Sequence, residues 1–212
     1  MPTATLPRPS SVRRPRRAAA DALLERRTLR RLLDEATGLV ASVVPGHRDR
    51  AALVVRHLDE LVGMLSAHEA AITRAGLRVA RRDPVAAEAV ARLRGLRGDL
   101  GVQLARLRLA TPYWGRGASA VCRDTVWEVL LELGSVVDAL FATEETGVLP
   151  FVTDDDLPPR RPGTRELGHL LETLTPAAGA RWRRERMSPS ERAWWALLAG
   201  PAFARERRRL LV

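Results

Sequence analysis

The fold of this 212-residue chain is decided by the stretch Leu140-Phe141-Ala142-Thr143-Glu144-Glu145-Thr146-Gly147-Val148-Leu149-Pro150, which closes a long apolar segment on two glutamates and a proline. Steps of four and three residues back from Glu144 meet an apolar side chain every time, as on one face of an α-helix. The positions are Leu140, Val137, Leu133, Leu130 and Val126. Glu144 therefore faces the core, where an unpaired carboxylate is costly. A carboxylate at the end of a bundle helix needs a partner, and a metal ion is one candidate.

Three more amphipathic segments precede this one. The apolar periodicity predicts helices over about 18–43, 49–74, 84–109 and 124–148, separated by Pro45-Gly46, by Asp83-Pro84 and by a loop over 111–117. Four segments of about 25 residues with short connections predict an all-α protein, an up-down-up-down four-helix bundle. In the third segment, Gly95, Gly98 and Gly101 should either weaken the helix or permit close packing.

Composition supports the helical class and restricts the environment. Aromatic residues make up only 4% of the chain, and β-branched residues are sparse, so strands have little to build on. Charged residues interrupt every apolar run before it reaches the length of a transmembrane segment. The single cysteine, Cys122, excludes an intramolecular disulfide framework and fits a reducing compartment. We therefore expect a cytoplasmic protein without a transmembrane segment.

The two ends of the chain differ from its centre. Residues 1–17, rich in Pro, Ser and Arg, have no periodicity and predict a disordered arm. The bundle is expected over 18–150. Residues 151–212 predict a loop followed by helices that pack on the bundle, with a short helix over about 164–174. The last helix should begin at Ser188-Pro189-Ser190-Glu191, a capping serine followed by proline and glutamate.

The net charge of +10 is concentrated at the ends. Residues 1–30 contain eight Arg against one Asp and one Glu, a net of +6, and residues 178–212 contain nine Arg against three Glu, again +6. The remaining residues, 31–177, therefore carry −2. We interpret the basic ends as solvated termini of a near-neutral bundle. The alternative is a basic surface that binds nucleic acid.

Two short motifs resemble those of the hemerythrin-like, or HHE cation-binding, domains, in the bacterial branch that has a helical extension after the bundle. The fourth segment of that family ends in a histidine, two glutamates and a proline. Here these positions are Leu140, Glu144, Glu145 and Pro150. The family's second segment ends in two adjacent histidines and a carboxylate, of which this chain keeps only the histidine at His68. The C-terminal residues that resemble the family extension are Ser188-Pro189, Trp194-Trp195, Gly200-Pro201 and Phe203-Ala204-Arg205.

The resemblance covers about residues 20–212 and implies an ancestral centre with two irons that binds oxygen or a related small molecule. His68, Glu144 and Glu145 are the residues it leaves as candidate metal ligands. The other positions hold Leu140 in place of a histidine, Ala67 in place of the second adjacent histidine, and Ala71 in place of the carboxylate. We therefore expect no cofactor, or iron if the ancestral site survives.

Four histidines cannot supply a di-iron centre here. His47 falls in a turn and His169 falls beyond the bundle. His57, expected at the boundary or surface, and His68 are eleven residues apart, which is about 16 Å along a helix. His68 and Glu144 fall at the same end of two parallel helices, so we expect His68 to be a core histidine that contacts Glu144, and Glu144 to be paired with a histidine or an arginine.

These residues predict a binding or interaction module with an eroded di-iron site rather than an enzyme, since no nucleophile–base pair or phosphate-binding glycine loop is present. Its partner, a protein or a small molecule, is not specified by the sequence. Two alternatives stay open. One is a true metal- or oxygen-binding protein with a ligand-poor centre. The other is a helical protein that binds nucleic acid through its arginine-rich ends.

Overall fold

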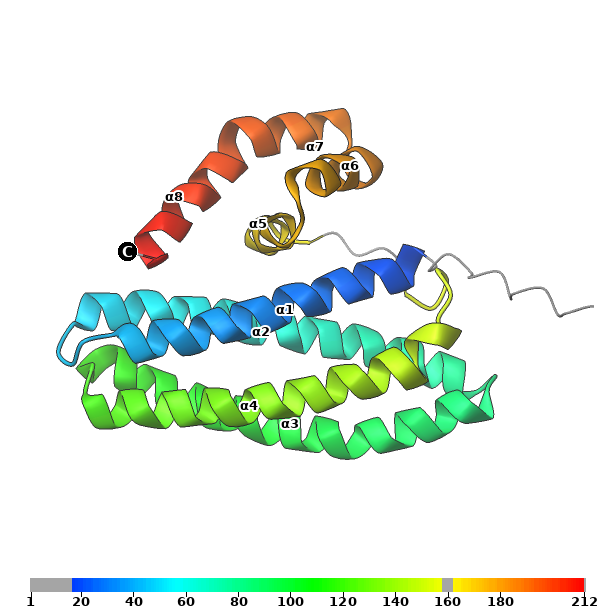
Figure 1. Cartoon of the computed structure of the whole chain (residues 1–212), viewed down its shortest axis with the longest axis horizontal. Coiled ribbons are helices and arrows are strands. Elements are labelled where there is room, and N and C mark those ends of the chain that lie inside the picture. The colour runs from blue at the N-terminus through cyan, green and yellow to red at the C-terminus, as the bar shows by residue number, and fades with distance from the viewer. Residues whose placement is uncertain (1–16, 158–161, 212) are drawn as a thin grey trace, which may run out of the picture.

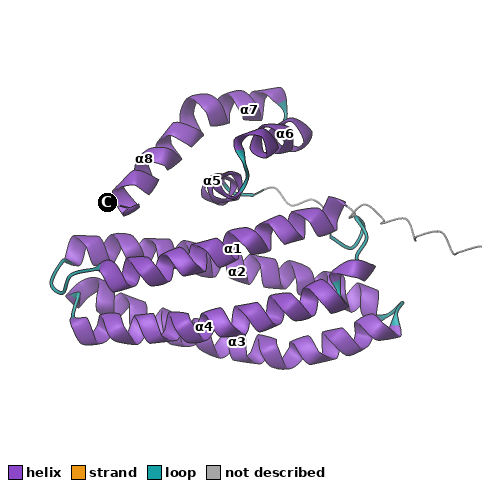
Figure 2. Cartoon of the chain, in the orientation of Figure 1, coloured by secondary structure: helices purple, strands orange, loops and turns teal. Residues whose placement is uncertain are grey.

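The structure, a computed structural model, describes residues 17–157 and 162–211, and this part of the chain is all-helical, without a strand. The predicted arm over 1–17 lies outside the described residues except for Arg17. The elements in chain order are α1 (Arg17–Ser42), α2 (Arg48–Ala80), α3 (Pro84–Gly117), α4 (Ala120–Gly147), the 3-10 turn η1 (Leu149–Phe151), α5 (Thr164–Thr173), α6 (Pro176–Arg186), α7 (Pro189–Trp194), the π-helical turn η2 (Trp195–Ala199) and α8 (Gly200–Leu211). Figure 2 shows the helices joined by short loops.

The four long helices lie side by side, and each packs mainly against two others (Figure 1). α1 contacts α2 and α4, and α3 contacts the same two helices. The loop between α1 and α2 meets the loop between α3 and α4, where the amide of Gly46 donates to the carbonyl of Ala118 over 2.9 Å. The α1–α2 loop and the α3–α4 loop therefore lie at the same end of the four packed helices.

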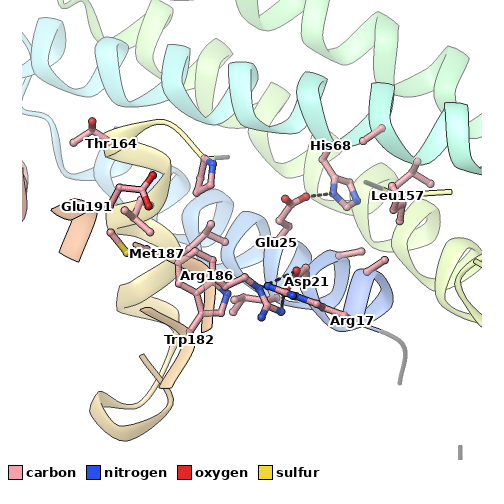
Figure 3. A pocket seen from close by; sticks show the side chains of 18 of the residues that line it. Arg17, Asp21, Glu25, His68, Leu157, Thr164, Trp182, Arg186, Met187 and Glu191 are labelled. Atoms are coloured by element: carbon pink, nitrogen blue, oxygen red, sulfur yellow. Dashed lines mark hydrogen bonds and ion pairs between the residues drawn. The ribbon is translucent and has the colours of Figure 1, made fainter. Parts of the chain in front are cut away.

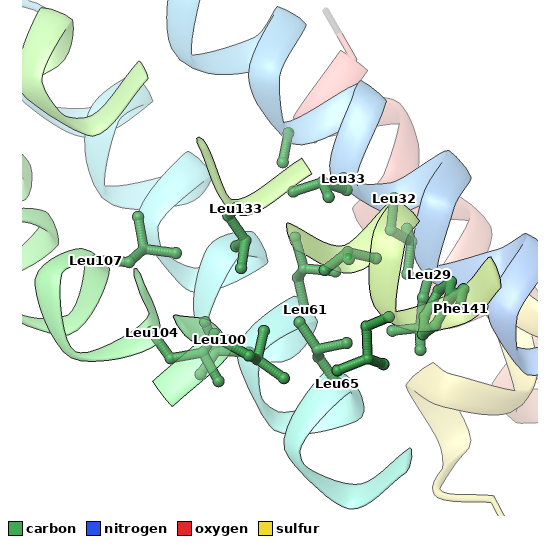
Figure 4. Packing of buried hydrophobic residues seen from close by; sticks show 14 of the residues in the cluster. Leu29, Leu32, Leu33, Leu61, Leu65, Leu100, Leu104, Leu107, Leu133 and Phe141 are labelled. Atoms are coloured by element: carbon green, nitrogen blue, oxygen red, sulfur yellow. The ribbon is translucent and has the colours of Figure 1, made fainter. Parts of the chain in front are cut away.

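The core between these helices is made mainly of aliphatic side chains, together with Phe141 and Trp114 (Figure 4). Every residue of the stripe that ends at Glu144 is buried, as the periodicity predicts, with exposed fractions between 0% and 1%. Other predicted core residues are buried as well, namely Leu58, Leu61, Leu65, Leu93 and Leu100. Of the two alternatives for Gly95, Gly98 and Gly101, close packing is contradicted, because a Cβ atom at any of them would meet nothing among the described residues within 4 Å.

Three helix boundaries differ from the predicted ones. α2 continues beyond about 74 to Ala80, because Ala75 and Val79, 0% and 1% exposed, extend its buried face. α3 continues through the expected loop and contains Pro112, because Thr111 and Trp114, 3% and 0% exposed, are packed into the core on this last part of the helix. α4 begins at Ala120 instead of about 124, since the side chain of Ser119 caps it by accepting from the amide of Cys122.

The C-terminal helices lie on the side of α1 and α2, away from α3 (Figure 1). α5 packs on α1, and α8 contacts both α2 and α5. The segment α7–η2–α8 starts at the predicted Ser188 capping box, and its π-helical turn precedes Pro201, which has no amide proton for a regular helical hydrogen bond. The sequence analysis did not predict α6. Among the described residues, no helix combines the length and apolar character needed to cross a membrane.

Candidate functional site

Charged side chains lie between the four long helices, where the family resemblance in the sequence predicts candidate metal ligands. We call Arg26 of α1, His68 and Glu69 of α2, and Glu144 of α4 the interior charge cluster. The side chains of Arg26, His68 and Glu144 are each no more than 1% exposed. Each of these groups is desolvated, so each needs a partner within the cluster.

Arg26 is the central cation of this cluster. Its guanidinium donates to Glu144 Oε2, and its Nε lies 3.5 Å from His68 Nε2. The guanidinium also lies 5.4 Å from the centre of the Phe141 ring, a cation–π distance. Arginine stays protonated in proteins. A permanent cation thus contacts both residues that would otherwise be available to a metal.

The structure brings together two of the three candidate metal ligands. His68 Nε2 lies 3.6 Å from Glu144 Oε2, in agreement with the expected contact. Glu145 is instead at the rim, with a side chain 39% exposed and an oxygen 3.7 Å from Arg26. Glu69, which was not a predicted ligand, lies beside His68 and Glu144. The potential ligand atoms of these three residues lie within 4.8 Å of one another. One imidazole and two carboxylates remain a small set of ligands for a di-iron centre.

The protonation states follow from burial and pairing. Burial alone would lower the pKa of His68, but its contacts with Glu144 and Glu25 raise that pKa to about 9. Burial likewise acts to raise the pKa of Glu144, yet His68 and Arg26 hold it below its usual value. Glu69 has weaker compensation from Arg97, so burial and the nearby Glu144 raise its pKa to about 7. Near neutral pH, His68 is therefore a cation and Glu144 an anion.

Arg26 was not predicted as a site residue, although its position on an apolar stripe of the sequence indicates that it is buried. Steps of four and three residues along α1 pass through Arg26 and otherwise meet only apolar residues, namely Ala22, Leu29, Leu33, Ala36 and Val40, all of them buried. A charge on an apolar stripe is the same pattern that singled out Glu144. The two charges are opposite, and they pair.

A pocket of about 440 Å³ opens next to this cluster, between α1 and α2 on one side and the C-terminal helices on the other. Figure 3 shows Glu25 and His68 on the wall formed by α1 and α2, with Trp182 and Arg186 across the pocket. Most of the other lining residues are apolar, among them Ala18, Ala22, Ala71, Leu157, Met187 and Trp194. This volume is within the range of small-molecule sites.

The histidines outside the cluster also differ from expectation. The prediction that His57 lies at the boundary or surface is wrong, because its side chain is only 3% exposed. His169 lies beyond the four long helices, as expected, but α5 folds back so that its ring centre is 5.8 Å from that of His57. This pair could not be predicted from the sequence, because α2 and α5 are far apart in the chain and meet only through tertiary packing.

Several arginines of the basic ends make contacts within the chain. Arg186 pairs with Asp21 of α1 at 2.6 Å, and Arg207 of α8 binds both oxygens of Glu35. Arg17 donates to the backbone carbonyl of Glu185 over 3.3 Å. These arginines hold the C-terminal helices on α1, so part of the terminal charge is neutralised within the protein.

Comparisons of this chain with protein-family models, with curated proteins and with solved structures found no match.

Proposed function

We propose that this protein is a non-catalytic binding module that holds a neutral, mainly apolar small molecule in the pocket beside the interior charge cluster. The observation that carries the proposal is the pocket itself, about 440 Å³ in volume and lined mostly by apolar side chains, two of them tryptophans. Apolar pockets of this size with a few convergent polar groups are typical of ligand sites.

The charged groups of the pocket explain why the ligand should be neutral. Asp21 is held by Arg186, and Glu25 by His68, whose Nδ1 lies 3.0 Å from its carboxylate. Glu191 accepts from the amide of Ser188 over 2.7 Å. Because these lining carboxylates are already engaged by cations or amides, a cationic ligand would need to displace an existing partner. Arg186 is engaged by Asp21 and Arg17 donates to the carbonyl of Glu185, so an anionic ligand would have to compete with these contacts. An uncharged ligand needs only the apolar walls and the two indole rings.

We also propose that the four long helices form an up-down-up-down, hemerythrin-like bundle with a C-terminal helical extension, in a cytoplasmic protein, and that Arg26 has replaced the metal. The placement of His68 and Glu144 at one end of α2 and α4 supports the relationship. The replacement is supported by the guanidinium that contacts both of them. A buried cation can neutralise Glu144 without a metal ion.

Binding of the neutral dye Nile red tests the pocket, with displacement by a panel of neutral aromatic and alicyclic compounds. We expect saturable binding of one dye per chain. Ala71→Trp, which places an indole in the pocket, should weaken it at least about tenfold, whereas Ala70→Trp on the adjacent exposed position is the matched control. Equal binding by the two variants, or no saturable binding to the wild-type protein, would reject the proposed site.

Metal analysis tests the second proposal independently of the pocket. Protein purified aerobically from iron-supplemented cells should contain far less than two iron atoms per chain. Two equivalents of iron with an oxo-bridge absorption band would instead establish a ligand-poor metal centre and would contradict the replacement by Arg26.

A further inference from the structure

A second cluster of histidines and carboxylates lies where the C-terminal helices meet α1 and α2. His57 and Glu60 are on α2, three residues apart, and His169 is on α5. The potential ligand atoms of these three residues lie within 4.8 Å of one another. We call them the docking triad. They are distinct from the interior charge cluster, since no residue is shared.

We propose that the docking triad binds one divalent first-row transition metal ion, such as Zn²⁺, and that this ion fastens α5 to α2. Two imidazoles and one carboxylate form a common ligand set for such ions, with the remaining position left to water. In a tetrahedral site, ligands at about 2.0–2.1 Å from Zn²⁺ are roughly 3.4 Å apart. The separation of 3.6 Å between His169 Nε2 and Glu60 Oε2 is close to this value, and the remaining ligand atoms, all within 4.8 Å of one another, would move closer together around the ion.

The geometry offers space and an unused ligand atom. A cavity of about 30 Å³ is lined by all three residues of the triad, together with Phe203 and Arg207, and this volume suits a single water molecule or ion. His57 Nε2 is buried without a hydrogen-bond partner among the described residues, and the His169 nitrogen that faces Glu60 is Nε2. The side chains of His57 and His169 are 3% and 2% exposed. A buried ring nitrogen without a hydrogen bond is costly unless something binds it.

The surrounding charges are arranged to leave Glu60 available. Arg165 binds Glu60 Oε1, whereas Oε2 lies 3.6 Å from His169 Nε2, beyond hydrogen-bond distance. An arginine on the far oxygen of a metal-binding carboxylate fixes its orientation, as outer-shell partners commonly do. Arg56 and Arg207 also line the cavity, and Arg207 is held by Glu35 and Glu172. Arg165 also pairs with Glu206 at 2.7 Å, so Arg165 and Arg207 each have a carboxylate other than Glu60.

Each imidazole would bind the ion through a ring nitrogen that carries no proton. Binding of the ion therefore releases the proton of any imidazole that is charged, which is a normal part of metal binding.

Titration of the full-length protein, first stripped with a chelator, with Zn²⁺ in a calorimeter tests this site. Co²⁺ added in parallel reports tetrahedral coordination through its visible absorption. We expect one Zn²⁺ per chain. His169→Ala and the milder Glu60→Gln should each weaken binding at least about tenfold, since ligand loss exceeds the effect of losing an outer-shell partner. Circular dichroism identifies any variant that fails to fold.

Two controls separate the triad from the other sites. His68→Leu, in the interior charge cluster, and Ala71→Trp, in the pocket, should leave Zn²⁺ binding unchanged. Unchanged affinity in folded Glu60→Gln and His169→Ala, loss of binding in His68→Leu, or no stoichiometric binding to the wild-type protein would each overturn the assignment. In the last case, His57 is only a buried imidazole that faces Glu35 at 3.3 Å.

Discussion

At the scale of single residues, the interior of the molecule depends on the pairing of Arg26 with Glu144. Both side chains are buried, and neither can regain the hydration it loses on folding. An ion pair of this kind adds little over apolar packing, but the loss of one member leaves the other as an uncompensated charge. The two residues therefore depend on each other more than either depends on its apolar neighbours.

Removal of one partner tests this dependence. We expect Glu144→Ala to lower the free energy of unfolding by about 3–5 kcal/mol, because Arg26 and His68 then remain as buried cations. Glu144→Gln keeps a hydrogen-bond acceptor and should cost less. The double change Glu144→Ala with Arg26→Met should recover part of the lost stability. Urea denaturation of the single and double variants should give a coupling energy of about 0.5–3 kcal/mol between the two substitutions. Glu88→Ala, in the exposed pair with Arg92, is the control. Additive effects of the two cluster substitutions would contradict the pairing.

The pKa of His68 leads to a second prediction. It is about 9 in the folded protein and about 6.5 in the unfolded chain. Between these values the folded state binds more protons, so the stabilisation from charged His68 is complete below pH 6.5 and is lost as pH rises through 9. One proton corresponds to a slope of at most about 1.4 kcal/mol per pH unit. Denaturant midpoints from pH 6 to 10 should fall more steeply for the wild-type protein than for His68→Gln. Parallel curves would show that His68 is not charged at neutral pH.

At the scale of helices, period and capping residues were enough to predict most elements, because these signals are local. The apolar stripe up to Glu144 and the Ser188 capping box fixed where helices lie. The end of α3 could not be predicted from these local signals. Pro112 indicated a loop, whereas the burial of Trp114, a tertiary effect, keeps the helix intact. The meeting of His57 with His169 also depends on tertiary packing, so neither the pocket nor the docking triad was predicted.

Glycine positions show which helix contacts are close. A Cβ atom at Gly147, the last residue of α4, would collide with the Cβ atom of Ala89 on α3, whereas at Gly98 it would meet nothing within 4 Å. We expect Gly147→Ala to destabilise the fold by about 1–3 kcal/mol through overpacking. The matched change Gly98→Ala should stabilise it by up to about 1 kcal/mol, because alanine is the better helix former. Thermal melting of both variants checks the difference.

Ala89→Gly provides the control for this contact. Added to Gly147→Ala, it removes the colliding atom and should relieve the strain in that variant. If Gly147→Ala were as stable as Gly98→Ala, the approach of α4 to α3 would not be close enough to require glycine.

At the scale of the whole molecule, ion pairs join the C-terminal helices to α1 and α2. Arg207 of α8 binds Glu35 of α1 and also lies 3.2 Å from Glu172 of α5, so one side chain joins three elements. Leu210 of α8 adds an apolar contact, since it belongs to the same buried cluster as the core residues of the long helices. Both the pocket and the docking triad exist only while this attachment holds, because each is lined from both sides of the interface.

Arg207→Ala should therefore loosen the C-terminal helices without unfolding the long ones. The side chain is 8% exposed, and its loss leaves Glu35 and Glu172 with Arg31 of α1 as their remaining shared cation, so that no arginine of α8 binds either carboxylate. Loss of hydrogen bonds to a charged group costs about 1.5–3 kcal/mol, which corresponds to at least about tenfold faster amide exchange wherever local opening governs it. Hydrogen–deuterium exchange should show this acceleration in α5 and α8, with α3 and α4 unchanged.

Arg208→Ala, at the next and exposed position, should leave the exchange of every helix unchanged. A uniform acceleration across all helices would mean that the C-terminal helices and the long helices unfold as one cooperative unit, and the pocket would then open only by global unfolding.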